Sequence, residues 1–203
     1  MRVAAKIISV VFHPLLMTTY LVLLLGIFFP QMLLIKASAL KLFALLVFFV
    51  TFVLPGLNMV MFKVNGVISS LTLESRAERI VPFIFISIIY SLVTALFFYK
   101  GSFGSNFNKL MLIVSLLVIA ATLITFFYKI SVHSISIWGA VGILLPLNKI
   151  VDGSLLWPTA AIIVVAGLVM SSRLFLNAHT PREILIGAVV GFSISFCALL
   201  LLF

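Results

Sequence analysis

The arginines, histidines and glutamates of this 203-residue chain, apart from Arg2 and His13, gather in three short stretches, although only 8% of its residues are charged. The stretches are LESRAER at residues 73–79, KISVH at 129–133 and SSRLFLNAHTPREILIG at 171–187. Arginine binds phosphate oxygens through a planar, bidentate fork, and histidine serves as nucleophile or general acid. These residue types suit an anionic substrate and fit chemistry at a phosphate ester or diphosphate, with Arg79 and Arg173 as the clamp.

The rest of the chain must position these stretches, and its composition indicates a membrane protein. Hydrophobic residues make up 65% of the chain, and the mean hydropathy is +1.42. A helix needs roughly 20 apolar residues to cross a bilayer core, and the apolar runs here lack the alternation of barrel strands. We therefore expect an all-α, polytopic integral membrane helix bundle of about six or seven transmembrane helices, with one domain over residues 1–203. The expected spans are Ile7–Phe29, Leu42–Phe62, Ile80–Tyr99, Leu110–Tyr128, Ser134–Leu147, Leu155–Ser171 and Glu183–Phe203.

The order of the spans predicts where the three stretches lie. Two expected spans separate the first stretch from the second, and two more separate the second from the third. An even number of crossings returns the chain to the same side of the membrane, so all three stretches should meet at one face. The span at Ser134–Leu147 is short and contains Pro146, which leaves it tilted, re-entrant or buried within the bundle.

The third stretch carries a resemblance to a known family. Ser172 and Arg173, followed after five residues by His179 and after three more by Glu183, resemble the Ser-Arg-x5-His-x3-Asp motif of the type 2 phosphatidic acid phosphatase family. Residues 130–133, Ile-Ser-Val-His, resemble that family's Pro-Ser-Gly-His motif and keep its serine and histidine.

The first stretch resembles the family's remaining motif, Lys-x6-Arg-Pro, less closely. Arg79 matches its arginine, Pro82 stands two positions late, and Thr72 occupies the place of the lysine. Arg76 precedes Arg79 by three residues and would share its face of a helix. We therefore expect Arg76 to replace the missing lysine as a phosphate ligand.

The resemblance implies a role for each remaining residue. His179 would be the nucleophile that forms a phosphohistidine, and His133 would be the general acid. Glu183 would orient the ring of His179. Ser131 and Ser172 would bind the phosphate together with the arginines.

Several of these residues also allow a structural interpretation. Residues 180–183, Thr-Pro-Arg-Glu, form a capping box with proline at the first helical position, so Glu183 could cap a helix, orient His179, or do both. Arg79 and Arg173 could be anchors that reach the lipid head groups. For His13, a local hydrogen bond or a place near the head groups is the favoured interpretation over a functional one.

The chain offers few ligands for a metal. It has four acidic residues and one cysteine, Cys197, with no carboxylate pair and no His/Cys cluster. We expect neither a metal nor a cofactor. A membrane prenyltransferase, which holds magnesium on clustered aspartates, is disfavoured for the same reason.

Together these observations predict an integral membrane lipid phosphatase. Its expected partners are a lipid phosphate or diphosphate of the phosphatidic acid or prenyl type, and membrane lipids. The basic residues are too scattered to bind nucleic acid. The residues leave open a phosphotransferase and, as the alternative outside catalysis, a transporter or degenerate relative that only binds an anionic head group.

The expected location is a bacterial cytoplasmic (inner) membrane. Counting lysines and arginines on each side of the membrane favours neither orientation once Arg76, Arg79 and Arg173, the arginines proposed to bind phosphate, are left out of the count. The family resemblance implies an active site that faces away from the cytoplasm.

Overall fold

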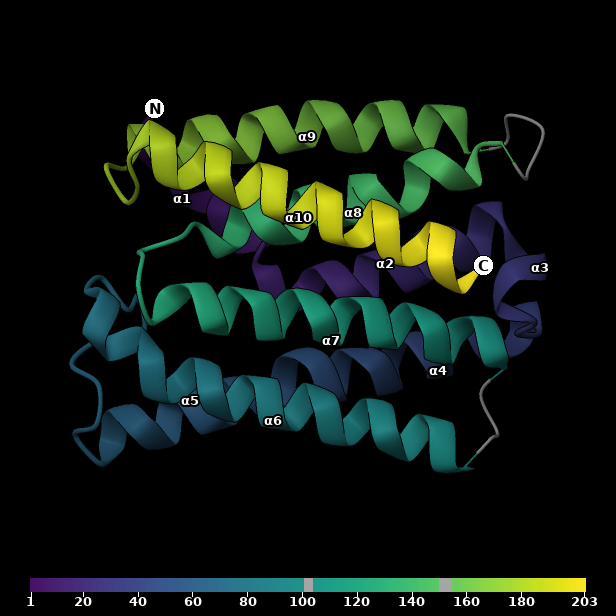
Figure 1. The fold of residues 1–203 in the computed structure, drawn as a ribbon, viewed down its shortest axis with the longest axis horizontal. Helices are drawn as coiled ribbons and strands as arrows, with labels where there is room; N and C mark the ends of the chain where they lie inside the picture. Colours follow the sequence, from purple (N-terminus) through teal and green to yellow (C-terminus); the bar gives the residue numbers. More distant parts are fainter. Residues whose placement is uncertain (101–103, 150–154) are drawn as a thin grey trace.

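The structure, a computed structural model, describes residues 1–100, 104–149 and 155–203. Every regular element in these residues is a helix, and the helices lie side by side in one bundle (Figure 1). The prediction of an all-α, polytopic membrane bundle is confirmed. The elements are α1 (Arg2–Val11), α2 (Pro14–Phe28), α3 (Pro30–Leu33), α4 (Ala37–Phe48), the π-helix η1 (Phe49–Val53), α5 (Leu54–Val64), α6 (Arg76–Lys100), α7 (Ser105–Thr125), α8 (Val132–Leu147), α9 (Leu156–Phe175) and α10 (Pro181–Leu202).

Five segments of the described chain are long and apolar enough to cross a membrane. They are α6, α7, α9, α10 and the continuous run Ala37–Val64, which joins α4, η1 and α5. The pair α1 and α2, bent by 61°, makes a sixth if it counts as one span. The 16-residue α8 is apolar but short, about 24 Å at 1.5 Å per residue. Most of its side chains are buried, so the other helices enclose it.

The break between α1 and α2 follows from Pro14. Proline has no N–H, so the carbonyl of Val10 accepts instead from the N–H of His13 at 3.2 Å. The carbonyl of Ser9 is thereby released from the helix ladder. His13 becomes the N-cap of α2, and its Nδ1 accepts from the N–H of Leu15 at 3.4 Å.

A seam of glycines brings α8 and α10 into close contact. A Cβ on Gly191 would lie 2.3 Å from the carbonyl oxygen of Ile135, and one on Gly187 would lie 2.8 Å from that of Ser131. Glycine is required because any side chain would hold the two backbones apart. At the end of the seam, the N–H of Ser131 donates to the carbonyl of Glu183 at 3.3 Å. The seam therefore fixes the second predicted motif relative to the third.

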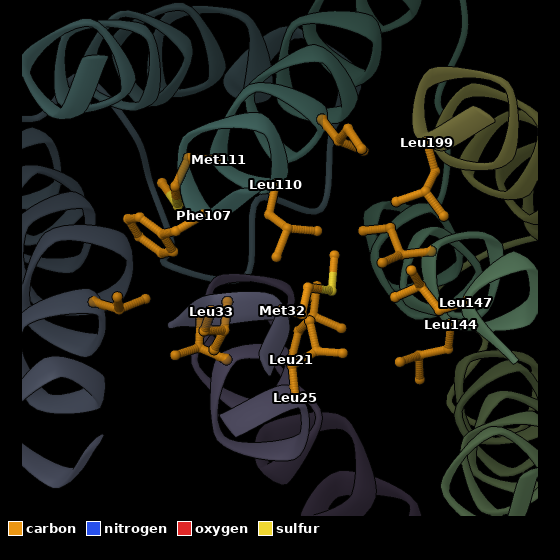
Figure 2. Close-up of a cluster of buried hydrophobic side chains, with 14 of the residues drawn as sticks. Leu21, Leu25, Met32, Leu33, Phe107, Leu110, Met111, Leu144, Leu147 and Leu199 are labelled. Carbon is orange, nitrogen blue, oxygen red and sulfur yellow. The ribbon is translucent and has the colours of Figure 1, made fainter. Parts of the chain in front are cut away.

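The two ends of the bundle differ in character. The connections at residues 65–75, 126–131 and 176–180, which adjoin or carry the three polar stretches, all lie at the left end in Figure 1, as the span order predicts. The opposite end is filled by a hydrophobic core from α2, α3, α4, α6, α7, α8 and α10, part of which is shown in Figure 2. Its labelled members are Leu21, Leu25, Met32, Leu33, Phe107, Leu110, Met111, Leu144, Leu147 and Leu199.

Candidate active site

A cavity of about 640 Å³ unites residues from all three polar stretches. Its polar wall contains Arg79 of α6, His133 of α8, Arg173 of α9 and His179 of the α9–α10 connection. The remainder runs between α2, η1, α5, α6, α7 and α8. There it is lined mainly by apolar side chains, among them Leu21, Leu57, Phe83, Leu117, Ile135 and Ile143. One end can hold an anion, and the body suits a hydrocarbon chain.

Glu183 holds the ring of His179. The two are joined by Nδ1 of His179 and Oε2 of Glu183, which lie 2.6 Å apart. A carboxylate only accepts, so Nδ1 carries the hydrogen and Nε2 keeps its lone pair. Burial lowers the pKa of His179 from its ordinary value of 6.5 to about 4, although the hydrogen bond that His179 donates to Glu183 acts to raise it. The ring is therefore neutral at pH 7, as a nucleophile requires.

The carboxylate of Glu183 has a second task. The N–H of Glu183 donates to Oγ1 of Thr180 at 3.3 Å, and the N–H of Thr180 donates to Oε2 of Glu183 at 3.4 Å. This is the predicted capping box, and it starts α10 at Pro181. The same oxygen thus caps the helix and holds the histidine, which fixes His179 to the end of α10. On its other side, the pair borders an outer hollow of about 340 Å³.

His133 is oriented by the backbone of α1. Its Nε2 lies 3.1 Å from the carbonyl oxygen of Ser9, the group that the break at Pro14 releases. Since a carbonyl only accepts, Nε2 carries the hydrogen. Nδ1 is then the nitrogen that can exchange a proton with a substrate. This arrangement fits a general acid. The helix break contributes to it by freeing the carbonyl that orients the ring of His133.

The two arginines of the cavity wall are held differently. Arg79 is buried, and it donates from Nε to the carbonyl of Leu73 at 2.8 Å and from a terminal nitrogen to that of Ile130 at 3.1 Å. It therefore ties α6 to the second polar stretch. Nε of Arg173 is buried and has no hydrogen-bond partner. Buried donors normally find an acceptor, so Arg173 retains capacity for an anion.

Three residues proposed as phosphate ligands do not line this cavity. The guanidinium of Arg76 donates to the carbonyls of Thr125 and Phe126, at the end of α7. The hydroxyl of Ser131 caps α8, and that of Ser172 donates to a carbonyl one turn earlier in α9. All three contacts are with the protein's own backbone. The structure thus gathers Arg79, Arg173, His133 and His179, with Glu183 behind His179.

Polar residues outside the predicted set also line the cavity, among them His13 and Thr72. The ring of His13 packs edge-on against that of His133, with centroids 5.8 Å apart and an angle of 80° between the planes. A histidine directly before a proline, in a span that the proline must break, is the sequence signal that points to this position. Thr72 stands where the family motif has its lysine, and it lines the same cavity.

The comparison with known families agrees with these motifs. Residues 125–203 match the model of the PAP2 superfamily. This segment contains α8, α9 and α10 with both histidines, Arg173 and Glu183, whereas Arg76 and Arg79 precede it. No match was found among curated proteins or solved structures. The match at residues 125–203 supports a type 2 phosphatidic acid phosphatase-like family, the PAP2 superfamily.

Proposed function

We propose that this protein is a membrane phosphatase that hydrolyses a lipid phosphate or diphosphate through a phosphohistidine, without a metal. PAP2 superfamily members are phosphatases, which supports the hydrolysis of phosphate esters. The observation that carries the lipid specificity is a cavity in which two arginines and three histidines adjoin an apolar body. A soluble phosphate ester would leave that body unused.

Binding would divide the substrate between the two parts of the cavity. Arg79 and Arg173 hold the nonbridging oxygens of the phosphate, because guanidinium groups match phosphate geometry and remain charged. The hydrocarbon tail lies in the apolar body, where burial gains about 0.8 kcal/mol per CH₂ group. The substrate enters sideways from the bilayer, so its tail need never cross water.

Catalysis would proceed in two displacements. Nε2 of His179 attacks phosphorus, and the bond between phosphorus and the leaving oxygen breaks. His133, whose Nε2 already carries a hydrogen, takes up a second proton at Nδ1 from the monoanionic phosphate and passes it to that oxygen, which makes it a better leaving group. Water then attacks the phosphohistidine, releases inorganic phosphate and restores His179. Glu183 holds the Nδ1–H of His179 throughout and stabilises the positive charge that forms on the ring.

Phosphate release from purified protein tests the function. The panel is phosphatidic acid, a polyprenyl diphosphate, phosphatidylglycerol phosphate and a water-soluble phosphate ester. We expect release from at least one lipid, in preference to the soluble ester, and undiminished release in excess chelator. No group of three or more His, Cys, Asp or Glu side chains that could hold a metal occurs among the described residues, and arginines can supply the positive charge.

The same panel separates the alternatives. Binding of a lipid without release would favour a head-group binding protein. Transfer of the phosphoryl group to an added alcohol, with little free phosphate, would indicate a phosphotransferase. Loss of release on chelation, restored by magnesium or zinc, would refute the metal-free mechanism.

Glu183→Gln separates orientation of His179 from helix capping. Glutamine also completes a capping box, so α10 should remain folded. The carboxylate raises the pKa of His179; its loss lowers that pKa further, and the acid limb of kcat/KM moves to lower pH. The rate at the plateau should fall by up to roughly 10⁴-fold, as when an amide replaces the carboxylate behind a catalytic histidine. A full rate with an unmoved acid limb would leave Glu183 as a cap alone.

We further propose that the protein resides in a bacterial cytoplasmic membrane with its site on the non-cytoplasmic face. Resemblance to the family supports this orientation. A cysteine at Asn65, which is exposed in the connection before α6, should label from outside intact cells in a Cys197→Ser background. If that cysteine is labelled only after the cells are opened, the site faces the cytoplasm and the proposed orientation is wrong.

A further inference from the structure

We propose that His13 selects diphosphates: its Nε2–H donates to the phosphate that remains on the leaving group, so the site favours a lipid diphosphate over the corresponding monophosphate. This inference rests on the proposed phosphatase function and narrows its substrate class. His13 lies outside the segment that matches the PAP2 model.

The helix break holds His13 in place beside the general acid. Pro14 ends the ladder of α1, and His13 follows that end as the N-cap of α2. Its ring packs edge-on against His133 on one side, at 5.8 Å, and against Phe52 of η1 on the other, at 6.1 Å. The ring is therefore fixed between two aromatic neighbours while it lines the cavity.

The hydrogen bonds of His13 determine which group it offers. Nδ1 accepts the N–H of Leu15, so in the neutral ring Nε2 carries the hydrogen. His13 is thus a hydrogen-bond donor without needing a positive charge. A hydrogen-bond donor in a cavity that two arginines also line is suited to an anionic oxygen.

The position of His13 along the cavity indicates which oxygen this is. His179 and the arginines mark the place of the phosphorus that is attacked. The residues that follow His13 in α2, including Met17 and Leu21, line the apolar body. His13 therefore stands where the polar wall passes into that body, and a substrate must cross this point between its reacting phosphorus and its tail.

The two substrate classes place different atoms at this crossing. In a monophosphate the ester oxygen is followed at once by uncharged carbon. In a diphosphate the crossing holds the second phosphate, whose oxygens are anionic and need donors. Removal of that phosphate from water is costly unless it is hydrogen-bonded, and His13 provides the bond.

Hydrolysis of a diphosphate follows the same two displacements. A bond forms between Nε2 of His179 and the terminal phosphorus, and the bond from that phosphorus to the bridging oxygen breaks. The bridging oxygen receives its proton from His133 and departs as part of the lipid monophosphate. Water cleaves the phosphohistidine to inorganic phosphate. His13 holds the departing phosphate during the first step.

Farnesyl diphosphate and farnesyl monophosphate test the inference, because they share one tail. The wild type should have the higher kcat/KM for the diphosphate. His13→Asn keeps an N-cap, since asparagine is among the best residues there, but its shorter side chain withdraws the donor. The ratio of kcat/KM for diphosphate to that for monophosphate should fall about ten- to a hundredfold, as expected for a lost hydrogen bond to a charged group.

Thr18→Val is the matched control. Thr18 lies in α2 and lines the same cavity, but it faces the tail that both probes share, so the ratio should remain at the wild-type value. A wild-type preference for the monophosphate, or an unchanged ratio in a folded His13→Asn protein, would overturn the inference.

Equilibrium binding of both probes, measured in parallel, separates this inference from the proposed function. If neither probe releases phosphate while His13→Asn weakens binding of the diphosphate alone, hydrolysis is refuted and diphosphate recognition stands. If release occurs and His13→Asn lowers binding of both probes equally, the phosphatase stands and the selective role of His13 is refuted.

Discussion

His179→Ala is expected to abolish phosphate release, with a loss of roughly 10⁴- to 10⁶-fold, as when a catalytic nucleophile is deleted. Nε2 of His179 is the ring nitrogen that the hydrogen bond to Glu183 leaves available for the proposed attack, and no cysteine is among the residues that line the cavity. Brief reaction of the wild type with lipid labelled in the transferred phosphate should leave acid-labile phosphate on the protein. The variant should carry none.

His133→Ala serves as the contrasting variant. A general acid matters most when the leaving oxygen needs a proton, so this variant should lose more activity on a lipid phosphate than on an activated aryl phosphate. It should also still form the phosphohistidine. Full activity in His179→Ala, or labelled protein in that variant, would exclude His179 as the nucleophile.

Gly191→Ala is expected to disable the site from a distance. The added Cβ would lie 2.3 Å from the carbonyl oxygen of Ile135 and 2.8 Å from its Cα. Both are backbone atoms, which cannot relieve the clash by changing rotamer as a side chain can. Overpacking of this kind costs about 1–3 kcal/mol or more, so the unfolding temperature should fall. Separation of α8 from α10 also moves His133 away from His179, and a misplacement of about 1 Å can cost 10²-fold in rate.

Gly167→Ala is the matched control for that variant. Gly167 lies in α9, and a Cβ there would meet nothing within 4 Å. Alanine is favoured over glycine in helices by about 1 kcal/mol, so this variant should be at least as stable as the wild type and fully active. Equal behaviour of the two variants would show that the seam does not set the geometry of the site.

The elements that depend on local sequence could be predicted. Five of the seven expected spans agree with long apolar helices because bilayer thickness fixes the length of an apolar run. The span expected at Ile7–Phe29 is instead bent by 61° between α1 and α2, and that at Ser134–Leu147 falls on the short α8. The start of α10 follows from four neighbouring residues, Thr180 to Glu183, since a capping box is a local structure. The family motif could be recognised because it depends only on the sequence spacing between Ser172 and His179. The comparison with the PAP2 model confirms that resemblance.

The contacts that link distant segments could not be predicted. His133 binds the carbonyl of Ser9, 124 residues earlier, and the break at Pro14 that releases this carbonyl does not specify which histidine will find it. Arg76 illustrates a second difficulty. The last carbonyls of a helix lack donors and attract cations, and those of α7 take its guanidinium, whereas spacing alone suggested that it would join Arg79.

Hydroxyl groups are a third reason why the predicted site and the structure differ. Serine can satisfy its hydrogen bonds within its own helix, and Ser131 and Ser172 both do so. A motif identifies the residue type but not whether its hydroxyl remains available. The cap formed by Ser131 still serves the site, because it starts the helix that carries His133.

The hydrophobic core at the far end of the bundle has an electrical consequence. A chamber lined by arginines inside a membrane protein would be a route for ions if it passed through to the other side. Leu21 and Ile143 belong both to the cavity lining and to the core, and beyond them Leu25 and Leu144 have 0% exposure. An ion would have to shed its water to enter this hydrocarbon, at a prohibitive free-energy cost. The core therefore insulates the chamber, and a charged substrate can be handled within the bilayer while the membrane keeps its voltage and its proton gradient.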